Sequence, residues 1–227
     1  MEPLAQQPVE DSPPAAPARA PSPAELAAAI SAKLCHDMIS PTSAINNGVD
    51  MLKDEDSDLH EEALAMIGES AEKLGALLEF YRVAFGASAT TEAFDVKALE
   101  GLTERVFAYM RADLDWSVPF EVLPKPAAKA LINIAQIAGA ALPRGGTAAI
   151  RAQQSGASVV LTAQAAGRIM QKAEVGEGLS GRPLGEGMVG YWVQGYYLWS
   201  FVTDAGGTLA FEKGDESFSL AVRLPGA

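Results

Sequence analysis

Residues 34–41 place an imidazole, an adjacent carboxylate, a hydroxyl and a proline within one helical pattern: His36, Asp37, Ser40 and Pro41. A neutral imidazole nitrogen is a nucleophile that can accept a phosphoryl group and hold it as a covalent phosphoramidate. Histidine side chains are partly neutral at cellular pH. The Asp37 carboxylate can hold the second ring N–H, which fixes the tautomer and stabilises the charge that develops on the ring. The segment therefore predicts a phosphoryl-carrying histidine with a supporting aspartate.

A histidine on a helix surface is usually only a solvated side chain, so the surrounding elements decide between the two interpretations. Two long helices are predicted around His36. The first begins at Ser22-Pro23-Ala24-Glu25, a capping box with proline at the first helical position, and extends to about residue 53. A polar loop over residues 54–57 leads to an Asp-x-x-Glu start signal at residues 58–61, and the second helix extends to about residue 87.

Both helices carry a stripe of apolar residues in steps of three and four, which is typical of helices packed side by side. The first stripe comprises Ile30, Leu34, Met38, Pro41, Ile45, Gly48 and Leu52. The second comprises Leu64, Ile67, Ala71, Leu74, Leu78, Tyr81 and Phe85. At about 100° per residue, His36 lies roughly 150° from the centre of the first stripe and faces outward. The residues that share or flank this outward face form the predicted partner-binding surface: Lys33, Ile39, Ser40, Ser43 and Asn47.

One apolar stripe per helix does not give a helical hairpin a stable core of its own. Pairing two hairpins into a four-helix bundle would cover both stripes, which predicts a homodimer. The C-terminal half of the same chain is the alternative cover. Pro41 removes a backbone donor inside the first helix and should bend or loosen the turn that ends at Asp37. We interpret that turn as room for the His36 ring to change rotamer between resting and transfer states.

The composition narrows the classes of partner. The chain has 227 residues and a net charge of −12, from 29 acidic and 17 basic residues. It contains no basic block, so binding to nucleic acid or to an anionic membrane is not expected. No run of about 18 apolar residues is present, and a cytoplasmic protein is expected. The single cysteine, Cys35, allows neither an internal disulfide nor a thiolate metal cluster. Residues 1–21, rich in Pro, Ala and Gln, are predicted to be a disordered tail.

Helices and strands alternate in the rest of the chain. Helices are predicted over residues 94–112, 126–141, 170–175 and 188–204. Strands are predicted over residues 116–120, 147–153, 158–165, 208–213 and 218–224. This order predicts an α/β sandwich in which helices are layered on a mixed or antiparallel sheet. The fold class is therefore α+β, with an antiparallel helical hairpin over residues 22–90 and a sandwich domain over residues 91–227.

Residues 94–227 resemble the ATP-binding domain of the GHKL superfamily, the fold of histidine kinases and gyrase, but the nucleotide residues differ. Family members carry an Asn-x-x-x-Asn pair whose second Asn holds Mg²⁺, whereas residues 133–137 end in Ile137, which cannot bind a metal. The family's Asp-x-Gly-x-Gly, which reads adenine, is replaced by Gln164-Ala165-Ala166-Gly167-Arg168. The glycine-rich phosphate loop is reduced to residues 185–190, where Glu186 would repel a phosphate. The resemblance implies a degenerate ATPase-like domain of the Bergerat type without ATP binding.

Over residues 22–227 the sequence is similar to one family in particular, the ChpT-type histidine phosphotransferases of the alphaproteobacterial CtrA phosphorelay. The matching segments are Leu34-Cys35-His36-Asp37, Ser40-Pro41, residues 82–89, residues 133–138 and Ala141-Leu142-Pro143. The resemblance implies a dimeric carrier that takes a phosphoryl group from the receiver domain of a hybrid histidine kinase. It also implies onward transfer to response regulators such as CtrA and CpdR.

On that resemblance, His36 is the phosphoacceptor and the sandwich domain contributes to the docking surface for regulators. The carrier needs no cofactor of its own, because Mg²⁺ is expected in the partner's receiver domain. Two rival functions are left open by the sequence. An ATP-dependent histidine kinase would bind Mg-ATP, and a non-catalytic dimeric scaffold would leave His36 inert.

Overall fold

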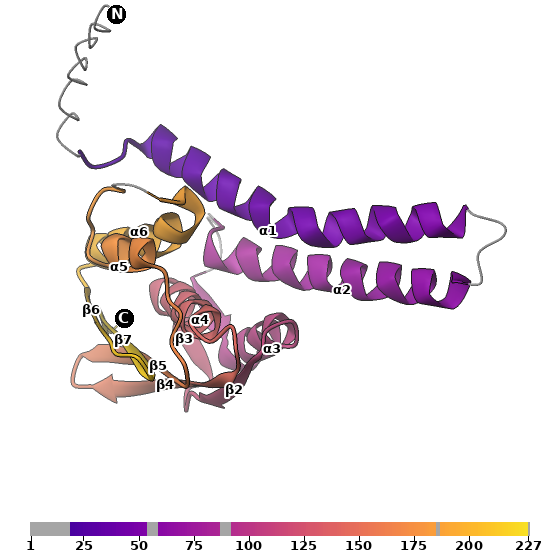
Figure 1. Ribbon diagram of the computed structural model, residues 1–227. Helices are drawn as coiled ribbons and strands as arrows, with labels where there is room; N and C mark the ends of the chain where they lie inside the picture. The colour runs from indigo at the N-terminus through magenta and orange to yellow at the C-terminus, as the bar shows by residue number, and fades with distance from the viewer. Residues whose placement is uncertain (1–18, 54–58, 87–91, 185–186, 227) are drawn as a thin grey trace, which may run out of the picture.

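A long helical hairpin forms the N-terminal part of the protein. The computed structural model describes residues 19–53, 59–86, 92–184 and 187–226. Within these residues, α1 (Pro23–Leu52) and α2 (His60–Ala84) run side by side in opposite directions (Figure 1). Most of the predicted disordered tail, and the predicted loop over residues 54–57, lie outside the described residues. The predicted antiparallel hairpin is confirmed.

The start of α1 has the local bonding that its sequence predicts. The Ser22 hydroxyl accepts a hydrogen bond from the Glu25 amide at 3.3 Å, and the Glu25 carboxylate accepts one from the Ser22 amide at 2.7 Å. This capping box satisfies two backbone donors that an α-helix leaves open at its N-terminus. Pro23 follows in the first turn, where its missing N–H has no consequence.

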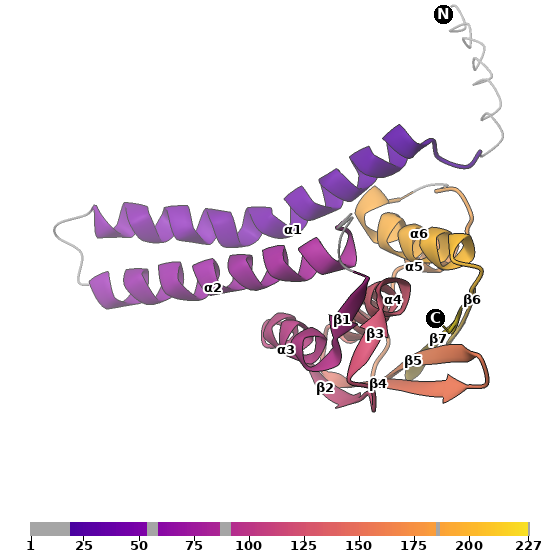
Figure 2. The ribbon, with the colours of Figure 1, turned by 180° about the vertical axis from the view of Figure 1, so that it is seen from behind.

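The helix α1 is bent partway along its length, as Figures 1 and 2 show. Pro41 lies inside it and has no N–H to donate to the Asp37 carbonyl. The Thr42 hydroxyl also donates to the Met38 carbonyl at 2.8 Å, a contact that favours bending. The bend lays the N-terminal half of α1 over α6 (Val189–Asp204), while the C-terminal half follows α2.

The second helix buries residues that lie outside the predicted stripe. Leu64 and Leu78 belong to that stripe, yet they are 59% and 49% exposed. Leu77 and Phe80 are buried instead and join the core of the C-terminal domain. Tyr81, at the end of the stripe, is buried as well. Within one chain, α2 therefore buries a face against the C-terminal domain and leaves exposed the part of the stripe that was predicted to meet a second hairpin.

A five-stranded mixed sheet forms the base of the C-terminal domain. Its strands are β2 (Ala112–Ser117), β4 (Gly146–Ser155), β5 (Ser158–Ala166), β6 (Thr208–Lys213) and β7 (Ser217–Pro225), in the order β2-β4-β5-β7-β6. Only the β2–β4 pair in this sheet is parallel. Two short strands, β1 (Ala93–Asp95) and β3 (Val122–Pro124), pair separately. The predicted sandwich with a mixed sheet is confirmed.

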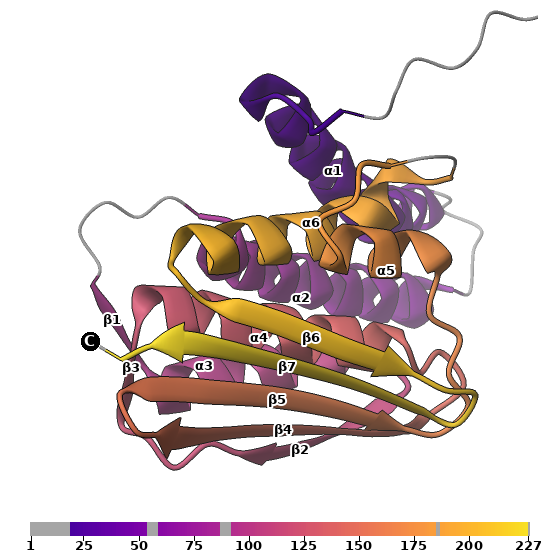
Figure 3. The same cartoon turned by 90° about the vertical axis from the view of Figure 1, so that its left-hand side faces the viewer.

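Helices cover one face of this sheet. They are α3 (Val96–Phe107), α4 (Lys125–Ala140), α5 (Ala173–Leu179) and α6, and Figure 3 shows them between the sheet and the hairpin. Nearly every residue from Ala127 to Gly139 in α4 is buried, because this helix packs against the sheet on one side and α2 on the other. None of the helices in the described part of the chain combines the length and apolar character that a membrane crossing requires.

Three predicted elements had wrong boundaries, and one of them is the short helix predicted over residues 170–175, which is α5 and extends from Ala173 to Leu179. The helix predicted over residues 94–112 is α3, which begins after Asp95, whose carboxylate accepts from the Ala98 amide at 2.7 Å, and ends at Phe107. The strand predicted over residues 116–120 is β2, which begins at Ala112. The reason is tertiary: residues 112–117 alternate between the inner and outer faces and pair in register with β4. That pairing outweighs the helical propensity of residues 108–112.

Candidate functional site

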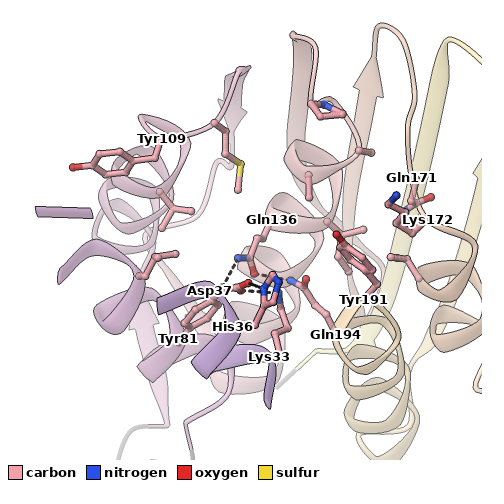
Figure 4. Close-up of a pocket in the computed structure, with 18 of the residues that line it drawn as sticks. Lys33, His36, Asp37, Tyr81, Tyr109, Gln136, Gln171, Lys172, Tyr191 and Gln194 are labelled. Atoms are coloured by element: carbon pink, nitrogen blue, oxygen red, sulfur yellow. Dashed lines mark hydrogen bonds and ion pairs between the residues drawn. The ribbon is translucent and has the colours of Figure 1, made fainter. Parts of the chain in front are cut away.

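His36 faces a cleft between the helical hairpin and the C-terminal domain (Figure 4). The cleft has a volume of about 620 Å³, and its walls come from α1, α2, α3, α4, α6 and the segment leading into α5. The imidazole lies at its edge and 64% of its surface is exposed. An incoming group can therefore reach the ring from solvent, as the outward placement on α1 predicts.

The Asp37 carboxylate is the point where four side chains meet. Its Oδ1 lies 3.1 Å from Nδ1 of His36. Its Oδ2 accepts a hydrogen bond from the Lys33 ammonium at 2.9 Å and a second one from the Tyr81 hydroxyl. The Asp37 side chain is 24% exposed and that of Lys33 only 12%, so this ion pair is shielded from water. Shielding strengthens both contacts relative to a surface pair.

The surroundings of Asp37 keep its carboxyl group ionised. Burial alone would raise the pKa of this group, because a low dielectric disfavours the charged form. The Lys33 charge and the hydrogen bonds from Tyr81, Lys33 and His36 outweigh that effect, and the net pKa of Asp37 lies below its usual value. An ionised carboxylate only accepts hydrogen bonds, so its contact with His36 places the ring proton on Nδ1. The Nε2 atom then carries the lone pair.

A chain of hydrogen bonds leads from Asp37 into the core of the C-terminal domain. The Tyr81 hydroxyl accepts a bond from Nε2 of Gln136 at 3.1 Å, and Oε1 of Gln136 accepts one from Nε2 of Gln194 at 2.6 Å. Burial and the negative charge of Asp37 raise the pKa of the Tyr81 hydroxyl, which therefore stays protonated and able to donate. Residues of α1, α2, α4 and α6 thus share one polar network.

The structure separates the predicted site residues into two groups. Lys33 was expected on the partner-binding surface, but its ammonium group is bound to Asp37 and lies 5.9 Å from the centre of the Tyr81 ring. Its position favours a role inside the site. The other four predicted contact residues are exposed on α1: Ile39, Ser40, Ser43 and Asn47. Of these, Ser40 also lines the cleft.

Tyr81, Gln136 and Gln194 were missed as site residues. Tyr81 was counted as part of the apolar stripe, where its hydroxyl had no assigned partner. Gln136 and Gln194 interrupt long apolar runs in α4 and α6, and both are buried. A polar side chain inside such a run needs a hydrogen-bond partner, and that signal was available in the sequence. The identity of the partner was not, because it depends on how the helices pack.

A second hollow of about 350 Å³ adjoins His36 on the side of α6. Ala32 and His36 line it from α1, and Met188, Val189 and Tyr191 line it from the start of α6. Met188, Val189 and Tyr191 are exposed apolar residues. The imidazole is therefore flanked by this apolar hollow on one side and by the larger cleft on the other.

The lining of the cleft differs from the GHKL nucleotide pattern. Ile137 lines it at the position where the GHKL pattern has a metal-binding asparagine, and among the described residues that line it Asp37 is the sole carboxylate. Asn133 is fully buried, and its amide nitrogen donates to the Ala84 and Lys129 carbonyls instead of facing the cleft. Across the described residues, no three His, Cys, Asp or Glu side chains gather as a metal site.

Comparisons with known proteins identify the family of the chain. Residues 96–217 match the family model described as "Histidine phosphotransferase C-terminal domain". The chain is 32% identical over 184 residues to "Protein phosphotransferase ChpT" of Brucella abortus (strain 2308), covering 80% of this chain and 87% of that protein.

Solved structures point the same way. One described as a bacterial phosphotransferase aligns with a TM-score of 0.78 and 30% identity, over 88% of this chain and 97% of that one. The Acinetobacter baumannii histidine kinase AdeS aligns with a TM-score of 0.51 and 13% identity, over 84% of this chain and 97% of that one. The second match shows a shared fold only.

Proposed function

The chain belongs to the histidine phosphotransferase family, and we propose that it relays phosphoryl groups between receiver-domain aspartates by carrying them on Nε2 of His36. Membership of the family makes it a phosphotransferase. One observation carries the assignment to His36: an exposed imidazole has its Nδ1 directed at a shielded, ionised carboxylate, which leaves Nε2 as the nucleophile.

In the proposed reaction, Nε2 of neutral His36 attacks the phosphorus of an aspartyl phosphate in the donor's receiver domain. The N–P bond forms, the P–O bond to the aspartate breaks, and the aspartate leaves as a carboxylate. The ring keeps its Nδ1 proton and becomes cationic. Asp37 stabilises that cation across the 3.1 Å contact. The reverse steps, with an acceptor aspartate as nucleophile, pass the group onward.

We further propose that the protein brings no cofactor to this reaction. Phosphoryl transfer depends mainly on positioning and on compensation of the phosphoryl charge. Mg²⁺ held by acidic residues of the receiver domain supplies that compensation. The lining of the cleft supports this division, because its lysines and amides do not provide a carboxylate cage for a cation. The same lining supports the proposal that the C-terminal domain does not bind ATP.

The exposed leucines of α2 support a homodimer. Leu64 and Leu78 face outward from the hairpin, and the C-terminal domain of the same chain does not cover them. A second hairpin packed against these residues would complete a four-helix bundle. The alternative cover predicted from the sequence applies to the other face of α2, where Leu77 and Phe80 pack into the C-terminal domain.

The proposed partners are the receiver domain of a hybrid histidine kinase as donor, and CtrA-like and CpdR-like response regulators as acceptors. They follow from the family resemblance. The exposed residues around His36 that would meet a receiver domain are Ile39, Ser40, Ser43 and Asn47. A cytoplasmic location is part of this proposal, since receiver domains act there. With a net charge of −12, nucleic acid is not a proposed partner.

A labelled transfer assay tests the function. A receiver domain carrying a radiolabelled aspartyl phosphate is mixed with the wild-type protein, with His36→Ala and with His60→Ala. Label is expected on the wild type and on His60→Ala, which changes the only other histidine of the chain, and not on His36→Ala. Equal labelling of His36→Ala would refute the assignment. Labelling of the wild type by ATP alone would favour a kinase.

A further inference from the structure

We propose that Tyr81, Gln136 and Gln194 are positioning residues for phosphoryl transfer, which hold the Asp37 carboxylate so that His36 keeps its proton on Nδ1 and its lone pair on Nε2. The inference rests on the proposed function, since it concerns the same histidine. It goes further because it gives the C-terminal domain a part in the chemistry of a residue that lies on the hairpin.

The directions of the bonds in this network leave no ambiguity. The Asp37 carboxylate only accepts, so the Tyr81 hydroxyl must use its single proton toward Asp37. The hydroxyl oxygen can then only accept from Gln136, which must present its NH₂ group. The carbonyl oxygen of Gln136 therefore faces Gln194 and accepts from its NH₂ group. Each group fixes the orientation of the next, and all of them lead to Asp37.

The burial of the network argues that it is retained for a purpose other than stability. Tyr81, Gln136 and Gln194 are 4%, 6% and 7% exposed. A buried amide costs free energy unless it is hydrogen-bonded, and replacing both partners of a buried hydrogen bond by apolar groups of the same shape can be neutral or even stabilising. A fully connected buried network instead specifies one arrangement of the groups it joins.

The geometry at Asp37 shows what that arrangement controls. Tyr81 and Lys33 both bind Oδ2, which leaves Oδ1 for the His36 ring. The Tyr81 ring is itself held edge-on by Phe80, with centroids 6.0 Å apart, and packs at a tilt against Phe85, with centroids 5.5 Å apart. Lys33 has a long, flexible side chain, whereas Tyr81 is fixed by its ring contacts and by Gln136. Tyr81 is therefore the contact that sets the carboxylate's rotation.

The test uses Tyr81→Phe, which removes the hydroxyl and keeps the ring. Its matched control is Tyr197→Phe, because the Tyr197 hydroxyl also has a hydrogen-bond partner, Lys129, and its ring packs against Phe85 at 5.1 Å. Tyr197 lies outside the chain that leads to Asp37. Two readouts are measured: the rate constant and half-saturation for transfer from a phosphorylated receiver domain, and the ¹⁵N spectrum of ring-labelled histidine. The chain has two histidines, so His36→Ala assigns the signals.

In Tyr81→Phe, the ¹⁵N signals of His36 should move from the Nδ1–H form toward a mixture of tautomers. The maximal transfer rate should fall by about tenfold, with half-saturation unchanged, because the docking residues on α1 are intact. Gln136→Met should give a smaller change of the same sign, since it removes the support of Tyr81 but keeps the hydroxyl. Tyr197→Phe should give neither change.

Two outcomes would overturn the inference. An unchanged His36 spectrum and rate in Tyr81→Phe would reduce the network to helix packing, while the loss of labelling in His36→Ala would still support the proposed function. Equal losses in Tyr81→Phe and Tyr197→Phe would indicate general loosening of the aromatic cluster. Labelling of His36→Ala would instead refute the proposed function itself.

Discussion

Asp37→Asn is the sharpest test of how the site is built, because it keeps the shape of the side chain and changes only its charge and bonding. Three donors converge on the carboxylate: His36 Nδ1 at 3.1 Å, Lys33 Nζ at 2.9 Å and the Tyr81 hydroxyl. Asparagine offers one acceptor oxygen, one NH₂ group and no charge. Unless the His36 ring moves its proton from Nδ1 to Nε2, at least one of the three donors must then face another donor.

The structure sets the size of the effect on stability. Asp37→Asn leaves the Lys33 ammonium without its counter-charge in a place where its side chain is 12% exposed. A lost hydrogen bond between charged groups costs about 1.5–3 kcal/mol. A fully buried pair would cost more, about 3–5 kcal/mol, but Asp37 is 24% exposed and water can partly replace it. The free energy of unfolding should therefore fall by about 2 kcal/mol.

The effect on transfer follows from the tautomer. Without the carboxylate, His36 loses both the group that holds its proton on Nδ1 and the charge that stabilises the cationic ring. General acid–base partners of this kind contribute about 10²–10⁴ in rate, so a loss of about 10²-fold is expected. The rate is measured by quenched time courses with saturating phosphorylated receiver domain, and stability by urea unfolding.

The control is Asp50→Asn on the same helix. Asp50 pairs with Lys53 at 2.9 Å, but both side chains are about 70% exposed, so the contact should contribute little to stability and nothing to transfer. If Asp37→Asn transferred phosphoryl groups at the wild-type rate, Asp37 would have no role in the chemistry. If it were as stable as Asp50→Asn, the shielded ion pair would contribute no more than a surface pair.

The pH dependence of the same variant has a definite sign. The pKa of Asp37 is lower in the native state, so the unfolded state binds its proton first as the pH falls below about 4. The stability that Asp37 contributes is therefore complete above that pH and is lost as the pH falls through the native pKa. The difference in unfolding free energy between the wild type and Asp37→Asn should be constant above about pH 5 and should shrink below pH 4. A difference that grew in acid would contradict this account.

Three further predictions concern the scaffold. Pro41→Ala restores a backbone donor and should straighten α1. Trp192, which is 3% exposed beneath the N-terminal half of α1, should then become hydrated, and its fluorescence should shift to the red. An unchanged spectrum would contradict the view that Pro41 causes the bend. Gly195→Ala places a Cβ 2.6 Å from the Val175 carbonyl oxygen of α5 and should lower the free energy of unfolding, measured with urea, by about 1–3 kcal/mol. Gly190→Ala adds its Cβ in open space and should leave that free energy unchanged. Leu78→Glu should convert a dimer to a monomer in light scattering; a wild-type monomer would refute the bundle.

The sequence predicts the parts of this fold that depend on local signals. The capping box at Ser22 and Glu25 fixes the start of α1, and the outward face of His36 follows from the helical period once that helix is placed. The strands β6 and β7 alternate clearly around a turn, so their bounds were predicted within one residue. These features need only neighbours in the sequence, or one helical face.

Features that depend on packing could not be predicted in this way. Leu77 and Leu78 are adjacent and equally apolar, and only the position of the C-terminal domain decides that Leu77 is buried and Leu78 exposed. The link from Tyr81 to Gln136 joins residues 55 positions apart, on helices whose crossing is set by the whole core. No local pattern encodes that distance.

The packing of α4 shows what the C-terminal domain contributes to the hairpin. The helix is buried on the sheet side and on the side of α2, so its removal would expose Leu77 and Phe80 of the hairpin as well as the core of the sheet. It also holds Gln136, which reaches Tyr81 and through it Asp37. The C-terminal domain thus stabilises the half of the hairpin that carries the site and sets the geometry at its histidine. Neither contribution involves a nucleotide, because both act through contacts within this chain.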